Sequence, residues 1–304
     1  MKQGIFSRVL DRLFYLPEKR QFQPSYFSDK ETFSFYCKNG YAVVRNVVDE
    51  DAIKIIKDTY RELYERPDFY EAGGFITTPN YGEAAQQKVL ERLKEANLHI
   101  LPKIFDLNKC EHDFFSLLVM KFPNDGSYVE PHQDVSMVDE LKATTTYLWI
   151  PVENIDETNG AMLVLPGSHL WGGWQKTHNR DITPLKKNSK WLISRMKPVY
   201  LNKGDVLLFD SSLIHASLPN TSGKVRFAMN TSVVPKGQQL VHYEVGPATP
   251  KGMVDRYDID FSFWKNMDYI HPASGKYKAG HTEPLRCSAQ LGKANLQYLL
   301  QKYS

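Results

Sequence analysis

The chain has 304 residues, of which 42% are hydrophobic and 24% are charged. Such a composition is typical of a soluble globular protein, and the length allows one buried core with elaborations. The formal net charge of +3 is too small to indicate a nucleic-acid partner, and no basic stripe interleaved with aromatic residues is present. No apolar run approaches the roughly 20 residues of a membrane-crossing helix, so we expect no membrane span.

The three cysteines, Cys37, Cys110 and Cys287, are far apart and form no CxxC pair. This pattern favours neither a disulfide framework nor a zinc site, and it predicts a reducing, cytoplasmic location. Residues 4–15 place apolar side chains on one helical face. We expect this segment to be a helix docked on the domain, although a membrane-surface anchor or a presequence would share the pattern.

The next elements in chain order predict a helical N-terminal part of about residues 1–113. Residues 41–48 indicate a strand through their β-branched content. A helix follows over about 52–66, with Asp49 or Asp51 as its cap, and a second covers about 83–96.

From residue 114 the sequence changes to short apolar runs separated by turn signals such as PNDG and NKG. This pattern predicts a fold that is mainly β with flanking helices, and a double-stranded β-helix (jelly roll, cupin-like) core over about 114–235. A C-terminal extension, 236–304, ends in a helix near 294–301, and all 304 residues form a single domain. The candidate strands are 117–122, 144–152, 161–166, 197–201, 205–210 and 227–234.

The segment Pro131-His132-Gln133-Asp134 carries the strongest chemical signal. On an extended strand His132 and Asp134 point to the same side, where an imidazole and a carboxylate can bind one metal ion. His215, 81 residues after Asp134, is the best third ligand. Two histidines and one carboxylate are the donor set of non-haem Fe(II) oxygenases. The HxD pair alone is weak evidence, because such pairs also arise by chance.

Arg226 strengthens this interpretation. It follows His215 by eleven residues, across a turn and at the head of the next predicted strand. A buried arginine near a metal needs an anion, and its planar fork suits a carboxylate such as the far end of 2-oxoglutarate. The alternative for Arg226 is a surface salt bridge.

Four motifs in order, PHQD (131–134), NGAMLVLPGSH (159–169), KGDVLLFDSSLIHAS (203–217) and RFA (226–228), resemble the phytanoyl-CoA dioxygenase family. The resemblance covers about residues 33–235. It implies a double-stranded β-helix core with Fe(II), 2-oxoglutarate and dioxygen as cofactor and co-substrates. It assigns the metal and catalytic roles to His132, Asp134 and His215, and 2-oxoglutarate binding to Arg226.

The resemblance also implies lesser roles around the co-substrate. Gln133 is expected near it, although a regular strand would turn this side chain to the opposite face. Ser217 could donate a hydrogen bond to the 2-oxoglutarate carboxylate. Trp149 is expected to form a wall of the cavity or simply to pack in the core. Asn159 and Gly160 match a turn that needs a positive φ at the glycine.

The implied activity is oxidation of a small molecule, most often hydroxylation, with release of succinate and CO2. Asp134 favours hydroxylation, desaturation or ring formation, because halogenating relatives lack this carboxylate. Two other classes stay open: a metal-dependent cupin-type enzyme that does not use 2-oxoglutarate, and a non-catalytic binding protein of the same fold. We expect a monomer or homodimer.

A long segment, residues 168–197, does not read as core strand. We hypothesise that it is a lid that binds an anionic, carrier-tethered or CoA-tethered substrate, with Gly172 and Gly173 as a hinge. The alternative is a solvated basic face with its tryptophans packed on the barrel rim. The segment contains the basic residues Lys176, Arg180, Lys186, Lys187, Lys190, Arg195 and Lys197, and the tryptophans Trp171, Trp174 and Trp191.

Overall fold

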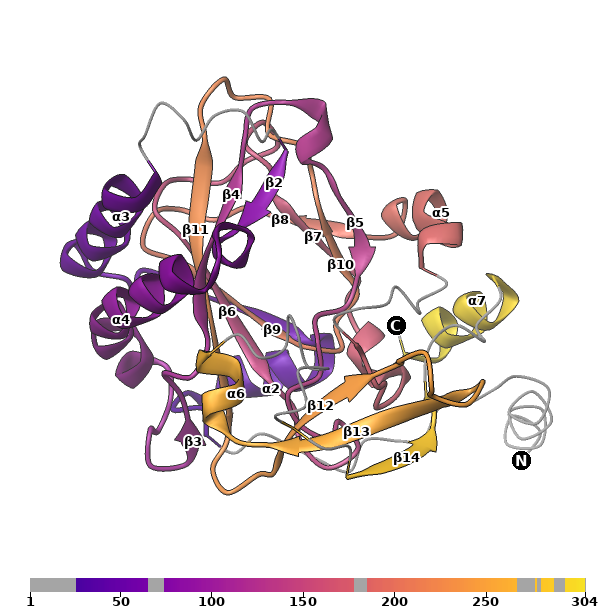
Figure 1. Ribbon diagram of the computed structural model, residues 1–304. Helices are drawn as coiled ribbons and strands as arrows, with labels where there is room; N and C mark the ends of the chain where they lie inside the picture. The colour runs from indigo at the N-terminus through magenta and orange to yellow at the C-terminus, as the bar shows by residue number, and fades with distance from the viewer. Residues whose placement is uncertain are drawn as a thin grey trace.

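Two antiparallel sheets face each other in the computed structural model, which describes residues 26–64, 74–177, 185–266, 277, 280–286 and 293–303 (Figure 1). The larger sheet has the strand order β1-β9-β6-β11-β4-β2, and β3 pairs with β11. Its strands are β1 (Tyr41–Val44), β2 (Phe75–Thr77), β3 (Cys110–Glu111), β4 (Ser116–Lys121), β6 (Thr146–Pro151), β9 (Val206–Asp210) and β11 (Arg226–Pro235).

The smaller sheet has the order β5-β10-β7-β8. Its short strands come from the same central stretch of the chain as most of the larger sheet. They are β5 (Val129–His132), β7 (Met162–Val164), β8 (Lys197–Val199) and β10 (His215–Ser217).

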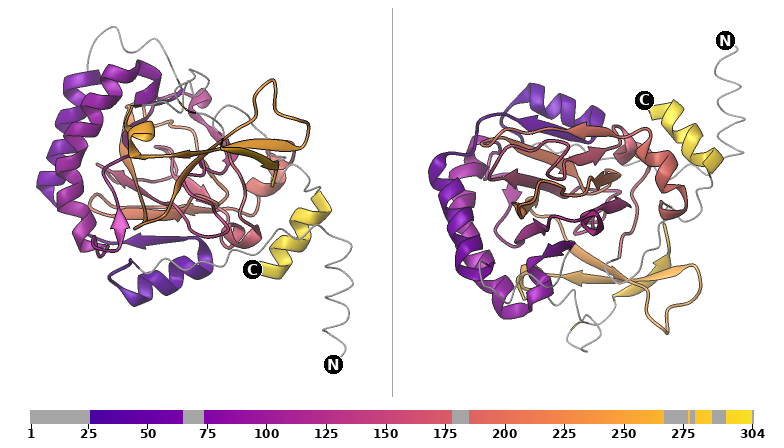
Figure 2. Two further views of the ribbon diagram at one scale, coloured as in Figure 1. Left: turned by 60° about the horizontal axis from the view of Figure 1, so that its bottom comes forward. Right: turned by 90° about the horizontal axis from the view of Figure 1, so that it is seen from above.

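The strands of the larger sheet are apolar on both faces because both faces are covered. On β4, Leu118 and Met120 belong to the core on the helical side, whereas Leu117 and Val119 belong to the core between the sheets. Helices cover the outer face of the sheet (Figure 2). A strand buried on both sides reads as a continuous apolar run rather than as an alternating one. The covering helices are α2 (Lys30–Asn39), α3 (Glu50–Tyr64) and α4 (Glu83–Ile100).

The N-terminal part is only partly as predicted. The helices expected over 52–66 and 83–96 are present as α3 and α4, and α4 continues to Ile100. The strand expected over 41–48 stops at Val44, and α2, whose first turn is capped by the Asp29 carboxylate, was not predicted. The helix expected over 4–15 lies outside the described residues. Within the described residues, no helix is both long and apolar enough to cross a membrane.

The C-terminal extension contains more structure than the single helix expected there. A third sheet, β12-β13-β14, crosses one end of the molecule (Figure 1). The helix near the end is present as α7, and the short α6 places Phe263 and Trp264 in the core between the sheets. These elements are β12 (Leu240–Glu244), β13 (Met253–Ile259), α6 (Phe261–Lys265), β14 (His281–Pro284) and α7 (Lys293–Tyr303).

Candidate active site

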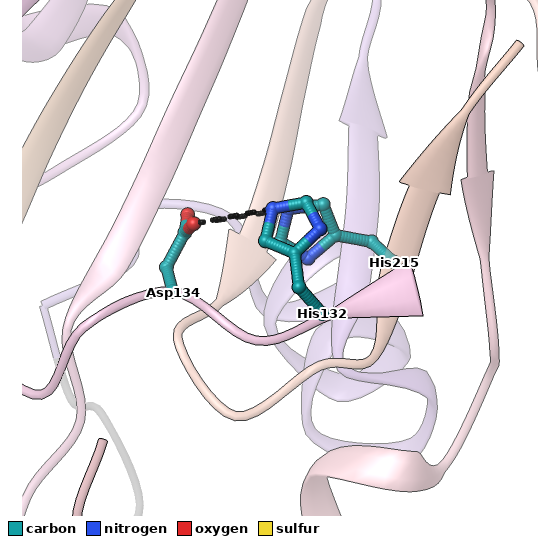
Figure 3. A group of neighbouring side chains, drawn as sticks. All are labelled: His132, Asp134 and His215. Atoms are coloured by element: carbon teal, nitrogen blue, oxygen red, sulfur yellow. Dashed lines mark ion pairs between the residues drawn. The ribbon is translucent and has the colours of Figure 1, made fainter. Parts of the chain in front are cut away.

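Three side chains converge at the edge of the smaller sheet: His132, Asp134 and His215 (Figure 3). His132 ends β5, His215 begins β10, and the two residues are direct partners in the antiparallel register. Asp134 lies just beyond the end of β5. Its Oδ1 is 3.7 Å from Nε2 of His132 and 3.8 Å from Nε2 of His215. Strand pairing therefore brings together residues that are more than 80 positions apart in the sequence.

The backbone fixes how both imidazoles present their nitrogens. Nδ1 of His132 lies 2.8 Å from the carbonyl oxygen of Glu130, and Nδ1 of His215 lies 3.0 Å from that of Leu213. A carbonyl can only accept, so each Nδ1 donates a proton and each Nε2 keeps its lone pair. Burial, and then the nearby His132, lower the pKa of His215 to about 4. At neutral pH His215 is thus in the uncharged form that binds metals.

These three groups fit an Fe(II) ion. Their donor atoms all lie within 4.8 Å of one another, a spacing that one ion can bridge. Two neutral imidazole nitrogens and one carboxylate leave half of an octahedral coordination sphere open for other ligands.

Arg226 is buried next to this cluster with spare hydrogen-bonding capacity. Its Nε donates to the carbonyl oxygen of Asn159 at 3.2 Å, and its Nη2 donates to that of Gly160 at 3.4 Å. Its Nη1 is buried and has no partner among the described residues. Burial lowers the pKa of Arg226 to about 9, against the opposing effect of Glu153. A buried cation with an unused donor suits a carboxylate.

A cavity of about 80 Å³ connects Arg226 to the three converging side chains. Trp149 and Ser217 form part of its wall, and the Trp149 ring lies 5.0 Å from the guanidinium carbon of Arg226. Gln133 lines neither this cavity nor the larger one described below. Its Nε2 instead donates to the carbonyl oxygen of Ser212 at 2.6 Å, which braces the loop that leads into His215.

A buried lysine beside Arg226 was not singled out from the sequence. Lys121 is the direct partner of Arg226 across β4 and β11, and its Nζ donates to the carbonyl oxygens of Ser127 and Leu218, each at 2.6 Å. Burial, and then Arg226, lower the pKa of Lys121 to about 6. Gly160 allows this crowding. It has the expected positive φ of 87°, and a Cβ there would lie 2.7 Å from Cδ of Lys121.

A second, larger cavity of about 370 Å³ opens from the same cluster. Both cavities share Phe75, Val119, Asn230 and the metal-binding candidates His132 and Asp134. The sequence pattern did not identify its remaining wall residues, because they come from β2, β4, β6 and α6 and from the segments beside β2, β4 and β5. The signal that was available is a polar run, Asn230 to Ser232, in the middle of a predicted strand.

The described part of segment 168–197 does not border either cavity. Trp171 and Trp174 are buried in a core behind the smaller sheet. Lys176 is also buried and forms an ion pair with Glu140. The other basic side chains that the structure describes in this segment are exposed. They are Lys187, Lys190, Arg195 and Lys197. The hypothesis of an anion-binding lid is therefore not supported for these residues, and Arg180 and the Lys186 side chain lie outside what the structure describes.

Comparisons with known proteins point to one family. The curated relatives include a phytanoyl-CoA dioxygenase domain-containing protein 1 homolog from Dictyostelium discoideum, 22% identical over 264 residues, which are 71% of this chain and 94% of that protein. They also include phytanoyl-CoA dioxygenase 1 from Oryza sativa subsp. japonica, 29% identical over 250 residues, which are 67% of this chain and 88% of that protein.

Among solved structures, the non-haem alpha ketoglutarate dependent carbocyclase SnoK from nogalamycin biosynthesis has a similar fold. The TM-score is 0.50 at 20% sequence identity, and the match covers 70% of this chain and 86% of that chain. The family model described as Phytanoyl-CoA dioxygenase (PhyH) matches residues 36–228. Since that match spans more than half of the chain, the protein belongs to the phytanoyl-CoA dioxygenase family and is an oxidoreductase that uses Fe(II), 2-oxoglutarate and dioxygen.

Proposed function

We propose that this dioxygenase oxidises a small molecule at an iron held by His132, Asp134 and His215, with Arg226 binding the far carboxylate of 2-oxoglutarate. The observation that carries the proposal is the single small cavity that the three donor groups share with the unpaired Nη1 of Arg226. The proposal includes a double-stranded β-helix formed by the two facing sheets, and one domain for the whole chain.

Each residue then has a defined task. His132 and His215 offer neutral Nε2 atoms, because backbone carbonyls hold the proton on Nδ1. Asp134 supplies the one negative charge of the protein ligands. Arg226 orients the co-substrate, and Ser217 adds a hydroxyl to the wall of the same cavity. Trp149, beside Arg226, and Phe209, beside His215, exclude water from the cavity.

When bound together, Fe(II), 2-oxoglutarate and dioxygen supply an oxidant strong enough to take a hydrogen atom from carbon, with release of succinate and CO2. The carboxylate of Asp134 occupies the position that a halide would need. We therefore propose that the outcome is hydroxylation, or else desaturation or ring formation, which also begin with removal of a hydrogen atom from the substrate.

The test is a screen for succinate formation that depends on Fe(II), on 2-oxoglutarate and on compounds in a metabolite extract from the native host. Substrate-dependent succinate release supports the proposal. Oxidation of a metabolite without succinate would instead favour a metal-dependent enzyme that does not use 2-oxoglutarate.

A further inference from the structure

The larger cavity bears on the class of substrate. We propose that the substrate is an uncharged, mainly apolar molecule and that a hydroxyl group on it binds the side chain of Asn230. This inference rests on the function proposed above and goes beyond it by naming what enters the site.

The wall of the larger cavity is apolar and aromatic. Four aromatic side chains come from β2, β6, α6 and the residue just before β4, and β4 and the segment after β5 add aliphatic ones. Apart from the metal-binding candidates His132 and Asp134, no described residue in this wall carries a charge. A volume of about 370 Å³ lies within the usual range of small-molecule sites. The aromatic residues are Phe75, Phe115, Tyr147 and Trp264.

With Fe(II) and 2-oxoglutarate bound, the site would have no net positive charge to attract an anionic substrate. The two positive charges of Fe(II) and the one of Arg226 are balanced by one negative charge of Asp134 and two of 2-oxoglutarate, a sum of zero. Lys121, whose pKa is about 6, is mainly uncharged at pH 7. Glu153, which acts on Arg226, would only add negative charge. A carboxylate placed against this apolar wall would lose its hydration without gaining a partner.

Asn230 is a polar residue of this wall that has hydrogen-bonding capacity to spare. It pairs with Leu117 on one side and with Trp149 on the other in the register of the larger sheet. It lines both cavities and therefore lies where they meet. Its Oδ1 is buried and has no hydrogen-bond partner among the described residues.

Other polar side chains of this wall already have hydrogen-bond partners: Thr77 and Asn80 bond each other, and Tyr147 bonds the backbone. Asn80 Oδ1 accepts hydrogen bonds from the backbone nitrogen and the hydroxyl of Thr77, at 2.8 and 3.0 Å. The hydroxyl of Tyr147 donates to the carbonyl oxygen of Val135 at 3.4 Å. The amide of Asn230 is thus the group that can recognise substrate, and a hydroxyl fits it in either amide orientation because it both donates and accepts.

Three ring compounds of similar size test whether the cavity prefers an uncharged substrate and whether it binds a hydroxyl group: naphthalene, 2-naphthol and 2-naphthoate. Their binding is measured by equilibrium dialysis against the full chain loaded with Fe(II) and 2-oxoglutarate without oxygen, so that no turnover occurs. We expect 2-naphthol to bind about fivefold to tenfold more tightly than naphthalene, as one hydrogen bond predicts, and 2-naphthoate to bind most weakly. If 2-naphthoate binds as tightly as 2-naphthol, or if no ring compound binds, the proposal is wrong.

Asn230→Leu, which keeps the size of the side chain, tests the residue itself. We expect it to remove the advantage of 2-naphthol over naphthalene, and to leave naphthalene and 2-oxoglutarate affinities within about twofold, because only one hydrogen bond is lost. Asn108→Leu, at an exposed asparagine away from both cavities, is the matched control. Unchanged 2-naphthol binding in Asn230→Leu, or weakened 2-oxoglutarate binding alone, would reject the proposal.

The probe comparison on the unaltered protein decides the substrate class even if the variant does not fold. These binding results are also independent of turnover. A protein that binds 2-naphthol as expected but releases no succinate would count against the proposed function and not against the character of the cavity.

Discussion

At the scale of single residues, the two histidines are the most direct test of the metal site. We expect His132→Ala and His215→Ala each to abolish Fe(II)-dependent activity, because either change removes one of three protein ligands. Fe(II) binding measured by dialysis should fall in parallel. His281→Ala, at an exposed histidine of β14, is the control and should behave as the unaltered protein. Full activity of either variant under limiting iron would remove that residue from the ligand set.

Arg226 should affect the co-substrate rather than the substrate. Its Nη1 has no partner among the described residues, so we expect a 2-oxoglutarate carboxylate to complete its hydrogen bonding. Arg226→Ala should raise the KM for 2-oxoglutarate by the equivalent of roughly 2–5 kcal/mol and change the substrate KM much less. Arg195→Ala, at an exposed arginine, provides the comparison. An unchanged KM for 2-oxoglutarate would mean that Arg226 serves only the fold.

Lys121 predicts how stability changes with pH. Its pKa is about 6 in the folded protein against an ordinary value of 10.5, so between these pH values the unfolded chain binds more protons. The free energy of unfolding should therefore gain a contribution that rises with pH from about 6 and is complete above 10.5. Lys121→Met should flatten this rise, as measured by urea unfolding at several pH values. An identical pH dependence in both proteins would show that Lys121 is charged in the folded state.

The sequence predicted some of these residues and not others for a physical reason. His132, Asp134, His215 and Arg226 stand out because they are polar side chains at turn-strand junctions with recognisable spacing. Asn230 is one of three consecutive polar residues in β11, and its importance depends on which face of the strand meets the cavity. That face is set by the register with β4 and β6, which a single sequence does not specify.

At the scale of elements, one buried ion pair links the loops beside the proposed iron site. Glu140 accepts hydrogen bonds from Lys176, Ser211 and Ser212, so it links segment 168–197 to the turn that precedes His215. The sequence analysis placed Lys176 among the basic residues of a hypothetical lid or, alternatively, of a solvated basic face. The structure instead pairs it with a carboxylate that could not be located from the sequence, because the contact joins residues 36 positions apart.

This network predicts a large effect on stability. Lys176→Met leaves the Glu140 carboxylate buried without its cation and should lower the free energy of unfolding by roughly 3–5 kcal/mol. Adding Glu140→Gln to that variant should restore part of the loss, because the uncompensated charge is then gone. Lys190→Met, at an exposed lysine of the same segment, should change stability by less than about 0.5 kcal/mol. Equal effects of the two lysine changes would refute this role of the ion pair.

At the scale of the whole molecule, the C-terminal extension contributes to the larger cavity. The family match ends at residue 228, whereas Trp264 of the extension lines that cavity. Most central strands were predicted because apolar runs and turns alternate there, whereas the short β5 and β10 were not among the predicted strands. The third sheet was not predicted, because β13 is half-exposed and charged, and its pairing with β12 and β14 is the only thing that marks it as a strand.

The last helix, α7, packs in a buried cluster that reaches β10, the strand that carries His215. Leu296 and Leu299 of α7 are fully buried in a cluster that includes Trp171 and Trp174 and reaches Ala216 on β10. We expect Leu299→Ala to lower the free energy of unfolding by roughly 2–5 kcal/mol, because it opens a cavity in this cluster. Well below the unfolding temperature the KM for 2-oxoglutarate should stay unchanged, since the helix touches neither cavity. Gln301→Ala, on the exposed side of α7, is the control for urea unfolding. A stable Leu299→Ala protein would mean that α7 is not docked in solution, and a raised 2-oxoglutarate KM at low temperature would mean that β10 moves with the helix.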